Sequence, residues 1–336
     1  MDSEVRPSAI AWHRAAAELA APTDERDPTE RLRAVDWARR AADEAMHRLA
    51  WEEAARLRRL ALDLGGAAID DDARCGLLLG LAQALQRCGD LATSLATCSK
   101  AAQLARDMDR PDLLADAALV LQGGDPALSR KLQRLAEEAL AAHPNGPATT
   151  RSRLLAQVAE ARLYQHDEAG ADTLSRDSVA EAEAGGDRDT LLMALRARRL
   201  ATLSPYRTDE TLQLADRVLD HAPGAGHARH AFWAHVWRIQ VWMVRGRLDL
   251  MTSELEPLAD RVDELREPLA TAQLQRFRAI LASTRGQFAD ALEIAERGQS
   301  EFLRTGQAIA AAQHAGLRPA VMVREKSPCR GGRRDW

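Results

Sequence analysis

The segment Arg285-Gly286-Gln287-Phe288-Ala289-Asp290-Ala291-Leu292 carries the pattern that decides the fold. In it a glycine is followed two positions later by a large residue, and three positions after that by a small one. Arg87–Leu95 has the same order, with Gly89 as the glycine and Leu91 as the large residue. Glycine tolerates the left-handed backbone conformation that ends many helices. The pattern therefore predicts that one helix ends at the glycine and that another begins two residues later.

The large residue of this pattern recurs along the chain at a nearly constant spacing. We call it the anchor of each copy, and the anchors are Trp51, Leu91, Leu128, Glu168, Thr208, Leu248 and Phe288. Successive anchors are 40, 37, 40, 40, 40 and 40 residues apart. Each interval has room for two helices, because N-cap signals such as Asp70-Asp71-Asp72 and Asp187-Arg188-Asp189 stand midway. Each period is thus predicted to be a hairpin, in which an A helix precedes the break and a B helix begins at the anchor.

The composition favours the same architecture, since only 4% of the residues are aromatic and the chain is rich in strong helix formers. One hairpin cannot bury its apolar face alone, whereas stacked hairpins share a continuous core. We predict an all-α protein built as an α-solenoid of about seven helix hairpins. Capping helices are expected within residues 1–48, around 7–21 and 29–47, followed by repeats in 49–307 and an irregular, disordered basic tail in 308–336.

Packing roles can be assigned within each predicted B helix. The residue three positions after the anchor is small in four copies, which lets two helices approach closely; these residues are Ala54, Ser94, Ala171 and Ala291. The large apolar anchors are expected to be buried between hairpins; they are Trp51, Leu91, Leu128, Leu248 and Phe288.

Charge and hydropathy exclude several classes of protein. The chain has 46 basic and 50 acidic residues, a net charge of −4, which argues against a main role in holding nucleic acid. It lacks both a run of apolar residues long enough to span a membrane and the apolar core of a signal peptide at its start. Four cysteines without a C-x-x-C pair suit a reducing compartment. We expect a cytoplasmic protein without direct nucleic-acid or membrane binding.

The hairpin pattern resembles tetratricopeptide repeats, although its period of about 40 residues matches better the longer repeats of maltose-regulator-like helical regions. Ala34–Ala45 followed by Trp51–Leu57 is similar to the start of the repeat region in actinobacterial LuxR-type and AfsR-type regulators. Asp125–Leu128, Arg153–Ala156 and Gly286–Leu292 are similar to the same region. The resemblance covers residues 30 to 305 and implies a sensor or regulatory arm that takes a protein or peptide partner.

The chain departs from those regulators outside the repeats. In them an NTPase module of the STAND type precedes the repeats and a helix-turn-helix domain follows. The glycine-rich phosphate loop G-x-x-x-x-G-K-S/T is absent here, and Ala308–Trp336 resembles no DNA-binding module. The sequence therefore resembles the repeat region alone, either as a standalone paralogue or as a truncated regulator.

Catalytic chemistry has little support in the sequence, because neither G-x-S-x-G nor H-E-x-x-H is present. We expect no enzyme activity and no cofactor. The strongest alternative is a small-molecule or metal site in the hairpin of residues 221–242. That hairpin concentrates imidazole and aromatic side chains, namely His221, His227, His230, His235, Phe232, Trp233, Trp237 and Trp242. The spacing of the histidines argues against convergence, since His230 and His235 are five positions apart on a helix.

The remaining candidate for a functional site is the surface of the predicted solenoid. The A helices of a helical solenoid are expected to line its concave side, where a protein or peptide partner would bind. The candidate contact residues are polar A-helix positions that helix packing is expected to leave free: Arg196, Arg199, His235, Arg238, Gln275 and Arg278. The predicted function is a non-catalytic protein-interaction module.

Overall fold

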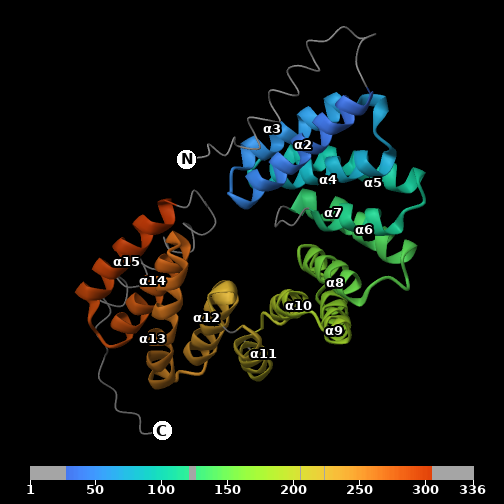
Figure 1. The fold of residues 1–336 in the computed structure, drawn as a ribbon. Coiled ribbons are helices and arrows are strands. Elements are labelled where there is room, and N and C mark those ends of the chain that lie inside the picture. The colour runs from blue at the N-terminus through green and yellow to red at the C-terminus, as the bar shows by residue number, and fades with distance from the viewer. Residues whose placement is uncertain (1–27, 121–125, 205, 223, 305–336) are drawn as a thin grey trace, which may run out of the picture. The chain divides into compact units, whose positions relative to one another are not determined.

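The computed structural model of the protein describes residues 28–120, 126–204, 206–222 and 224–304. Within these ranges the chain forms fourteen α-helices and two short 3₁₀ helices, without any β-strand (Figure 1). The all-α prediction is confirmed. The capping helix expected around residues 7–21 and the tail expected at 308–336 lie outside the described residues, as does Cys329.

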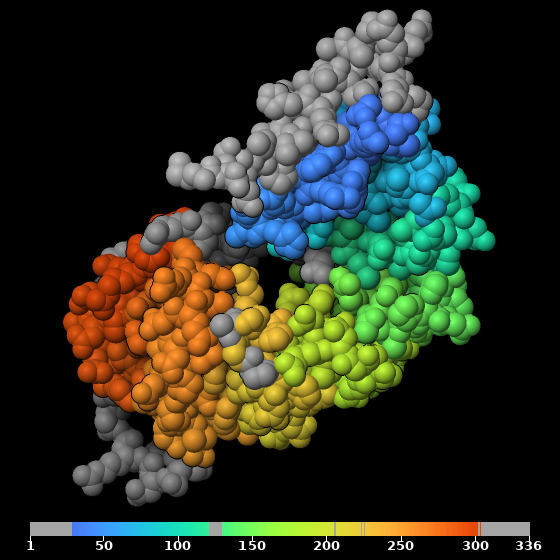
Figure 2. Space-filling view, viewed as in Figure 1, coloured from blue at the N-terminus to red at the C-terminus, as the bar shows by residue number. Residues whose placement is uncertain are grey.

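Two compact units make up the chain, residues 1–201 and 202–336. The described helices of the N-terminal unit are α2 (Pro28–His47), α3 (Trp51–Gly65), η2 (Gly66–Ala68), α4 (Asp71–Arg87), α5 (Leu91–Asp107), α6 (Pro111–Val120), α7 (Pro126–Ala142), α8 (Ala148–Leu163), α9 (Glu168–Gly185) and α10 (Arg188–Ala201). Those of the C-terminal unit are α11 (Thr208–His221), η3 (Ala225–His227), α12 (Ala228–Val244), α13 (Leu248–Leu265), α14 (Pro268–Thr284) and α15 (Phe288–Arg304). In Figure 2, α2 to α9 of the N-terminal unit run in chain order from blue to green.

The predicted repeat register is visible in where the helices begin. Six anchors are the first residue of an α-helix: Trp51, Leu91, Glu168, Thr208, Leu248 and Phe288. The seventh, Leu128, is the third residue of α7. The N-cap signals also act as predicted, since the Asp70 carboxylate accepts from the amide of Ala73 at 2.8 Å ahead of α4. The period of about 40 residues is therefore the period of the helix pairs.

Six of the breaks between consecutive helices share one backbone geometry. The second or, at His166, the third residue after the helix end has a positive φ angle of 52° to 84°; these residues are Leu49, Gly89, Asp109, His166, Gly246 and Gly286. The following amide then donates to the carbonyl five residues earlier, as Asp90 does to Leu85 at 3.0 Å. This is the Schellman arrangement, which satisfies carbonyls that a helix end would leave unpaired. Glycine marks only three of these six breaks, so the other three carry no glycine signal.

Substitutions at the left-handed position of two of these breaks are expected to change the free energy of unfolding in opposite directions. A side chain in the left-handed region costs about 1–2 kcal/mol. Gly89→Ala is therefore expected to lower the free energy of unfolding by about that amount. Leu49 is 68% exposed, so Leu49→Gly gives up little burial and should leave the free energy unchanged or raise it by up to about 1 kcal/mol. Urea unfolding of the two variants measures both; a loss at Leu49→Gly as large as at Gly89→Ala would contradict this reading of the breaks.

Burial in the B helices is concentrated one turn after the anchor. In six of the seven copies the side chain three positions after the anchor is buried; these residues are Ala54, Ser94, Ala171, Thr211, Met251 and Ala291. The Ser94 hydroxyl donates to the carbonyl of Ala82 on α4 at 2.6 Å, which places α5 directly against α4. The residue is small in five of these six, and Met251 is large; in the remaining copy Lys131 is exposed on α7.

The anchors themselves are less buried than expected. Leu91 and Leu248 are 43% and 37% exposed, and Trp51 and Phe288 are half-buried. The side chain of Leu128 lies outside the described part of the structure. The physical reason is position, because the first residue of a B helix stands beside the turn at the edge of its hairpin. The residue one turn later faces the A helix instead.

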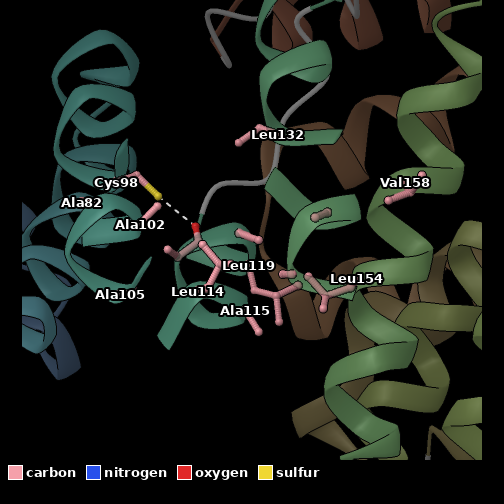
Figure 3. Close-up of a cluster of buried hydrophobic side chains, with 14 residues drawn as sticks. Ala82, Cys98, Ala102, Ala105, Leu114, Ala115, Leu119, Leu132, Leu154 and Val158 are labelled. Atoms are coloured by element: carbon pink, nitrogen blue, oxygen red, sulfur yellow. Dashed lines mark hydrogen bonds between the residues drawn. The ribbon is translucent and has the colours of Figure 1, made fainter. Parts of the chain in front are cut away.

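A buried cluster of the N-terminal unit joins α4 to α8, and it is built mainly from alanine and leucine (Figure 3). Cys98 lies within this cluster, and its thiol donates to the carbonyl of Ala117 on α6 at 2.8 Å. Burial raises the pKa of Cys98 to about 12. Cys75 is buried as well, and Cys88 is half-buried. The two buried thiols act as small core residues.

Candidate binding surface

The A helices of the N-terminal unit form one continuous layer, because α4 packs on α6, α6 on α8 and α8 on α10. Two contacts join neighbouring helices of this layer along its open side. The Gln157 amide donates to the carbonyl of Ala118 at 2.9 Å, and Arg196 pairs with Glu160 at 2.9 Å. We call this side the A-helix surface and define it by its exposed and half-buried residues: Gly76, Gly80, Gln83, Arg87, Asp116, Arg153, Gln157, Glu160 and Arg196.

A hollow of about 500 Å³ lies on this surface where α4, α6 and α8 meet. It is lined by Gln83, Gln86, Arg87, Leu119, Val120 and Arg153, and we call it the basic hollow. The Arg87 guanidinium lies 5.7 Å from the centre of the Trp51 ring, a cation–π contact that holds the charge in place. The buried Nε of Arg153 has no hydrogen-bond acceptor among the described residues. Arg87 and Arg153 are the charged residues of this lining among the described residues, and both are positive.

The charge of Arg153 acts on two carboxylates, Asp116 on α6 and Asp187 ahead of α10. Burial is the main cause that raises the pKa of Asp116, with a further contribution from the neighbouring Asp112 and an opposing one from Arg153. Hydrogen bonds from Thr190 are the main cause that lowers the pKa of Asp187. Neither carboxylate lines the basic hollow.

A second hollow of about 530 Å³ lies between α2 and α4, and we call it the apolar hollow. Its apolar wall is formed by Leu32, Val35, Ile69 and Leu77. Its charged rim is already paired internally, since Arg39 bonds Asp36 at 2.8 Å and Asp43 at 3.3 Å. Arg58 reaches the same rim from α3 and pairs with Asp43. The apolar wall is the part of this hollow that remains open for a ligand.

Two glycines in the interior of α4 separate the hollows, at a cost of about 1 kcal/mol each relative to alanine. Gly80 has a structural reason, because a Cβ there would lie 2.7 Å from Cζ of Arg58. Burial is the main cause that lowers the pKa of that guanidinium. Gly76 is exposed, and a Cβ on it would meet nothing within 4 Å. Packing within the described chain therefore does not account for Gly76.

The two predicted contact residues of the N-terminal unit, Arg196 and Arg199, differ in how far they are exposed. Arg196 is exposed on the A-helix surface, where it pairs with Glu160. Arg199 is 7% exposed, and burial lowers its pKa, so helix packing does not leave it free. Its neighbour Arg198 is also buried and pairs with Asp172 on α9 at 2.8 Å. Arg196, Arg198 and Arg199 are so close in the sequence of α10 that they cannot all lie on one face of the helix. Arg196 is exposed, and the other two are buried.

In the C-terminal unit, His235 and Arg238 meet at a residue that the sequence reading missed. Glu254 on α13 is 8% exposed, and its Oε2 accepts from His235 Nδ1 at 2.8 Å. Its Oε1 lies 3.1 Å from Nη2 of Arg238, whose Nε is 3.8 Å from Asp216 on α11. Glu254 could have been found, because it stands between Met251 and Leu258 in the buried stripe of α13. An acidic residue in an apolar stripe signals a buried ion pair.

The remaining contact residues stay separate from this cluster of charges. Gln275 is half-buried and Arg278 is exposed, three positions apart on α14. The pairing of His235 and Arg238 with Glu254 explains how α12 is held to α13. It also engages two of the side chains that the sequence predicted to contact a partner.

The histidine and tryptophan side chains of residues 221–242 do not form a common site. His227 and His230 have ring centres 6.5 Å apart, whereas His221 bonds the carbonyl of Arg217 at 2.8 Å and His235 bonds Glu254. Among the described residues no three His, Cys, Asp or Glu side chains are grouped as metal ligands. Trp237 is buried, and Trp233 packs edge-on against Phe232 with ring centres 5.2 Å apart. These rings serve the packing of α12.

The comparisons with known proteins identify the fold. No family model matches the chain, and no curated protein matches it in sequence. Among solved structures, a tetratricopeptide repeat protein from Parabacteroides merdae superposes with a TM-score of 0.56 at 13% identity, covering 86% of this chain and 98% of that one. The fold is that of the tetratricopeptide-like helical-repeat solenoids. At this identity the likeness concerns the fold alone.

Two further structures share this repeat fold. A signal transduction ATPase with numerous domains (STAND) from Pyrococcus horikoshii, which has a tetratricopeptide repeat sensor, gives a TM-score of 0.60 at 12% identity. The match covers 95% of this chain and 55% of that protein. A Rap protein complexed with competence and sporulation factor gives a TM-score of 0.51 at 12% identity, covering 97% of this chain and 88% of that one.

Within the described ranges, no helix is long and apolar enough to cross a membrane.

Proposed function

We propose that this protein is a non-catalytic interaction module and that its A-helix surface binds a segment of a partner protein. The observation that carries the proposal is the pair of hollows on α4, one apolar and one basic, which are separated by less than three turns of the same helix. Such a surface offers apolar burial and directed charge side by side, which is what recognition of a peptide segment requires.

The repeat neighbours supply the context for this proposal. One of them is a STAND ATPase whose repeats are its sensor, and another is a Rap protein in complex with competence and sporulation factor. We propose by analogy that this chain belongs to the sensor or regulatory arm of a bacterial transcriptional regulator of the LuxR or AfsR type. The analogy rests on shared fold and on the sequence resemblance of residues 30 to 305.

Selection from a random library of displayed twelve-residue peptides tests the proposed function. The immobilised full chain should enrich peptides over uncoated support. Gln83→Trp places a bulky side chain on the A-helix surface and should abolish capture of the enriched peptides. Arg134→Trp, on the exposed side of α7, is the matched control and should leave capture unchanged. Failure to enrich any peptide, or equal loss in both variants, would refute this function.

A further inference from the structure

The basic hollow and the apolar hollow share one face of a single helix. On α4, Gly76 lines the apolar hollow, Gln83 and Arg87 line the basic hollow, and Gly80 lies between them. These four residues are spaced by four, three and four positions, so they lie in one row along α4. The surface over Gly76 is open, whereas the guanidinium of Arg58 lies over Gly80, so a ligand that follows this row contacts Arg58 on its way from one hollow to the other.

Charge complementarity defines what would fill the basic hollow. Arg87 and Arg153 present two guanidinium groups beside the amides of Gln83 and Gln86, and all four are hydrogen-bond donors. The lining contains no carboxylate among the described residues. A carboxylate is the group that two such donors bind most strongly, through charge-assisted hydrogen bonds. The aliphatic wall of Leu119 and Val120 excludes water from one side of that contact.

The helix also sets the distance between the two contacts. The α4 residues that line the two hollows are centred about ten positions apart, which is roughly 15 Å of helix at 1.5 Å per residue; they are Ala73, Gly76 and Leu77 in the apolar hollow and Gln83, Gln86 and Arg87 in the basic one. An extended chain covers this distance in four to five residues at about 3.3 Å each. Its side chains reach the same face at every second position, so the two contacting residues are four positions apart.

We infer that the A-helix surface binds an extended acidic segment of a partner protein, which crosses α4 over Gly76 and passes the guanidinium of Arg58 above Gly80. An aliphatic side chain of the segment fills the apolar hollow, and an Asp or Glu four positions away binds between Arg87 and Arg153. This inference rests on the proposed function, because it specifies the chemistry of the partner segment. It also gives Gly76 a role, since any side chain there would stand in the path of the segment.

The test uses peptides taken from the library selection, labelled with fluorescein and titrated with the full chain by anisotropy. The enriched sequences should carry an aliphatic residue and an Asp or Glu four positions apart. Arg87→Gln combined with Arg153→Gln should raise the dissociation constant at least about tenfold. The control pair, Arg130→Gln with Arg134→Gln, removes the same charge from the exposed side of α7 and should change it less than about twofold.

A double-mutant cycle and a glycine variant separate binding from folding. Replacing the acidic peptide residue by its amide should weaken binding to the wild-type chain, with no further loss in the double arginine variant. Gly76→Gln should weaken binding while the urea midpoint stays the same or rises, because glutamine favours the helix more than glycine does.

The outcomes distinguish this inference from the function on which it rests. Enriched peptides without an acidic residue, or peptides that bind the double arginine variant as tightly as the wild type, would overturn the inference. If Gln83→Trp still abolished capture of such peptides, the proposed function would stand without it. A selection that enriches no peptide would overturn both.

Discussion

Replacing Phe277 by alanine is expected to lower the free energy of unfolding by about 3–5 kcal/mol. Phe277 lies in the middle of α14 and is 0% exposed, so the substitution removes a ring and leaves a cavity in a packed interior. Phe288 is the matched control, because it is the same residue type and begins the next helix, where it is half-buried. Phe288→Ala is expected to cost only about 1–2 kcal/mol.

The comparison of the two phenylalanines checks the repeat register as well as the core. Urea unfolding followed by circular dichroism gives both values, and their order matters more than their size because repeat proteins can unfold in steps. If Phe288→Ala cost as much as Phe277→Ala, the anchors would be the main packing residues after all. The assignment of burial to the residue one turn later would then fail.

The second large effect is expected at Glu254. Glu254→Ala should cost about 2–4 kcal/mol, because it leaves His235 and Arg238 without the carboxylate that both contact. The value falls short of a fully buried pair because Arg238 is 29% exposed and can turn its charge toward water. Glu254→Gln keeps an acceptor in place and should cost about half as much.

Thermal and urea unfolding of both Glu254 variants test this. The alanine variant should be the less stable, and combining it with His235→Ala should give less than the sum of the two single effects, because the two side chains share one interaction. A loss below about 1 kcal/mol for Glu254→Ala would contradict a buried ion pair between α12 and α13.

Local chemistry explains why the helix boundaries could be predicted from the sequence. A helix end needs a left-handed residue and the next start needs a cap, and both signals lie within a few residues of one another at Gly89 and Asp90. The spacing of 40 residues then locates the weaker copies of the pattern from the position of a clear copy. At Leu49 and His166 the same turn forms without glycine, and only the period indicated a break there.

Burial and the binding surface were harder to predict because they depend on residues distant in sequence. Arg87 and Arg153 are 66 positions apart and meet only because α4, α6 and α8 stack. Arg199 was expected at the surface, yet α10 is packed on most of its circumference and buries it. Gly76 stands inside a helical segment with no motif around it, and its significance depends on the hollow that it lines.

The most direct test of the account is site-specific photo-crosslinking in the native cells. A photoreactive phenylalanine analogue at Asp116 lies on the exposed part of the A-helix surface beside the basic hollow, and the same analogue at Arg134 lies on the exposed side of α7. The account predicts a discrete crosslinked partner at position 116, lost when Arg87 and Arg153 are both glutamine, and none at position 134. A partner captured equally at both positions, or only at position 134, would contradict a binding function of the A-helix surface.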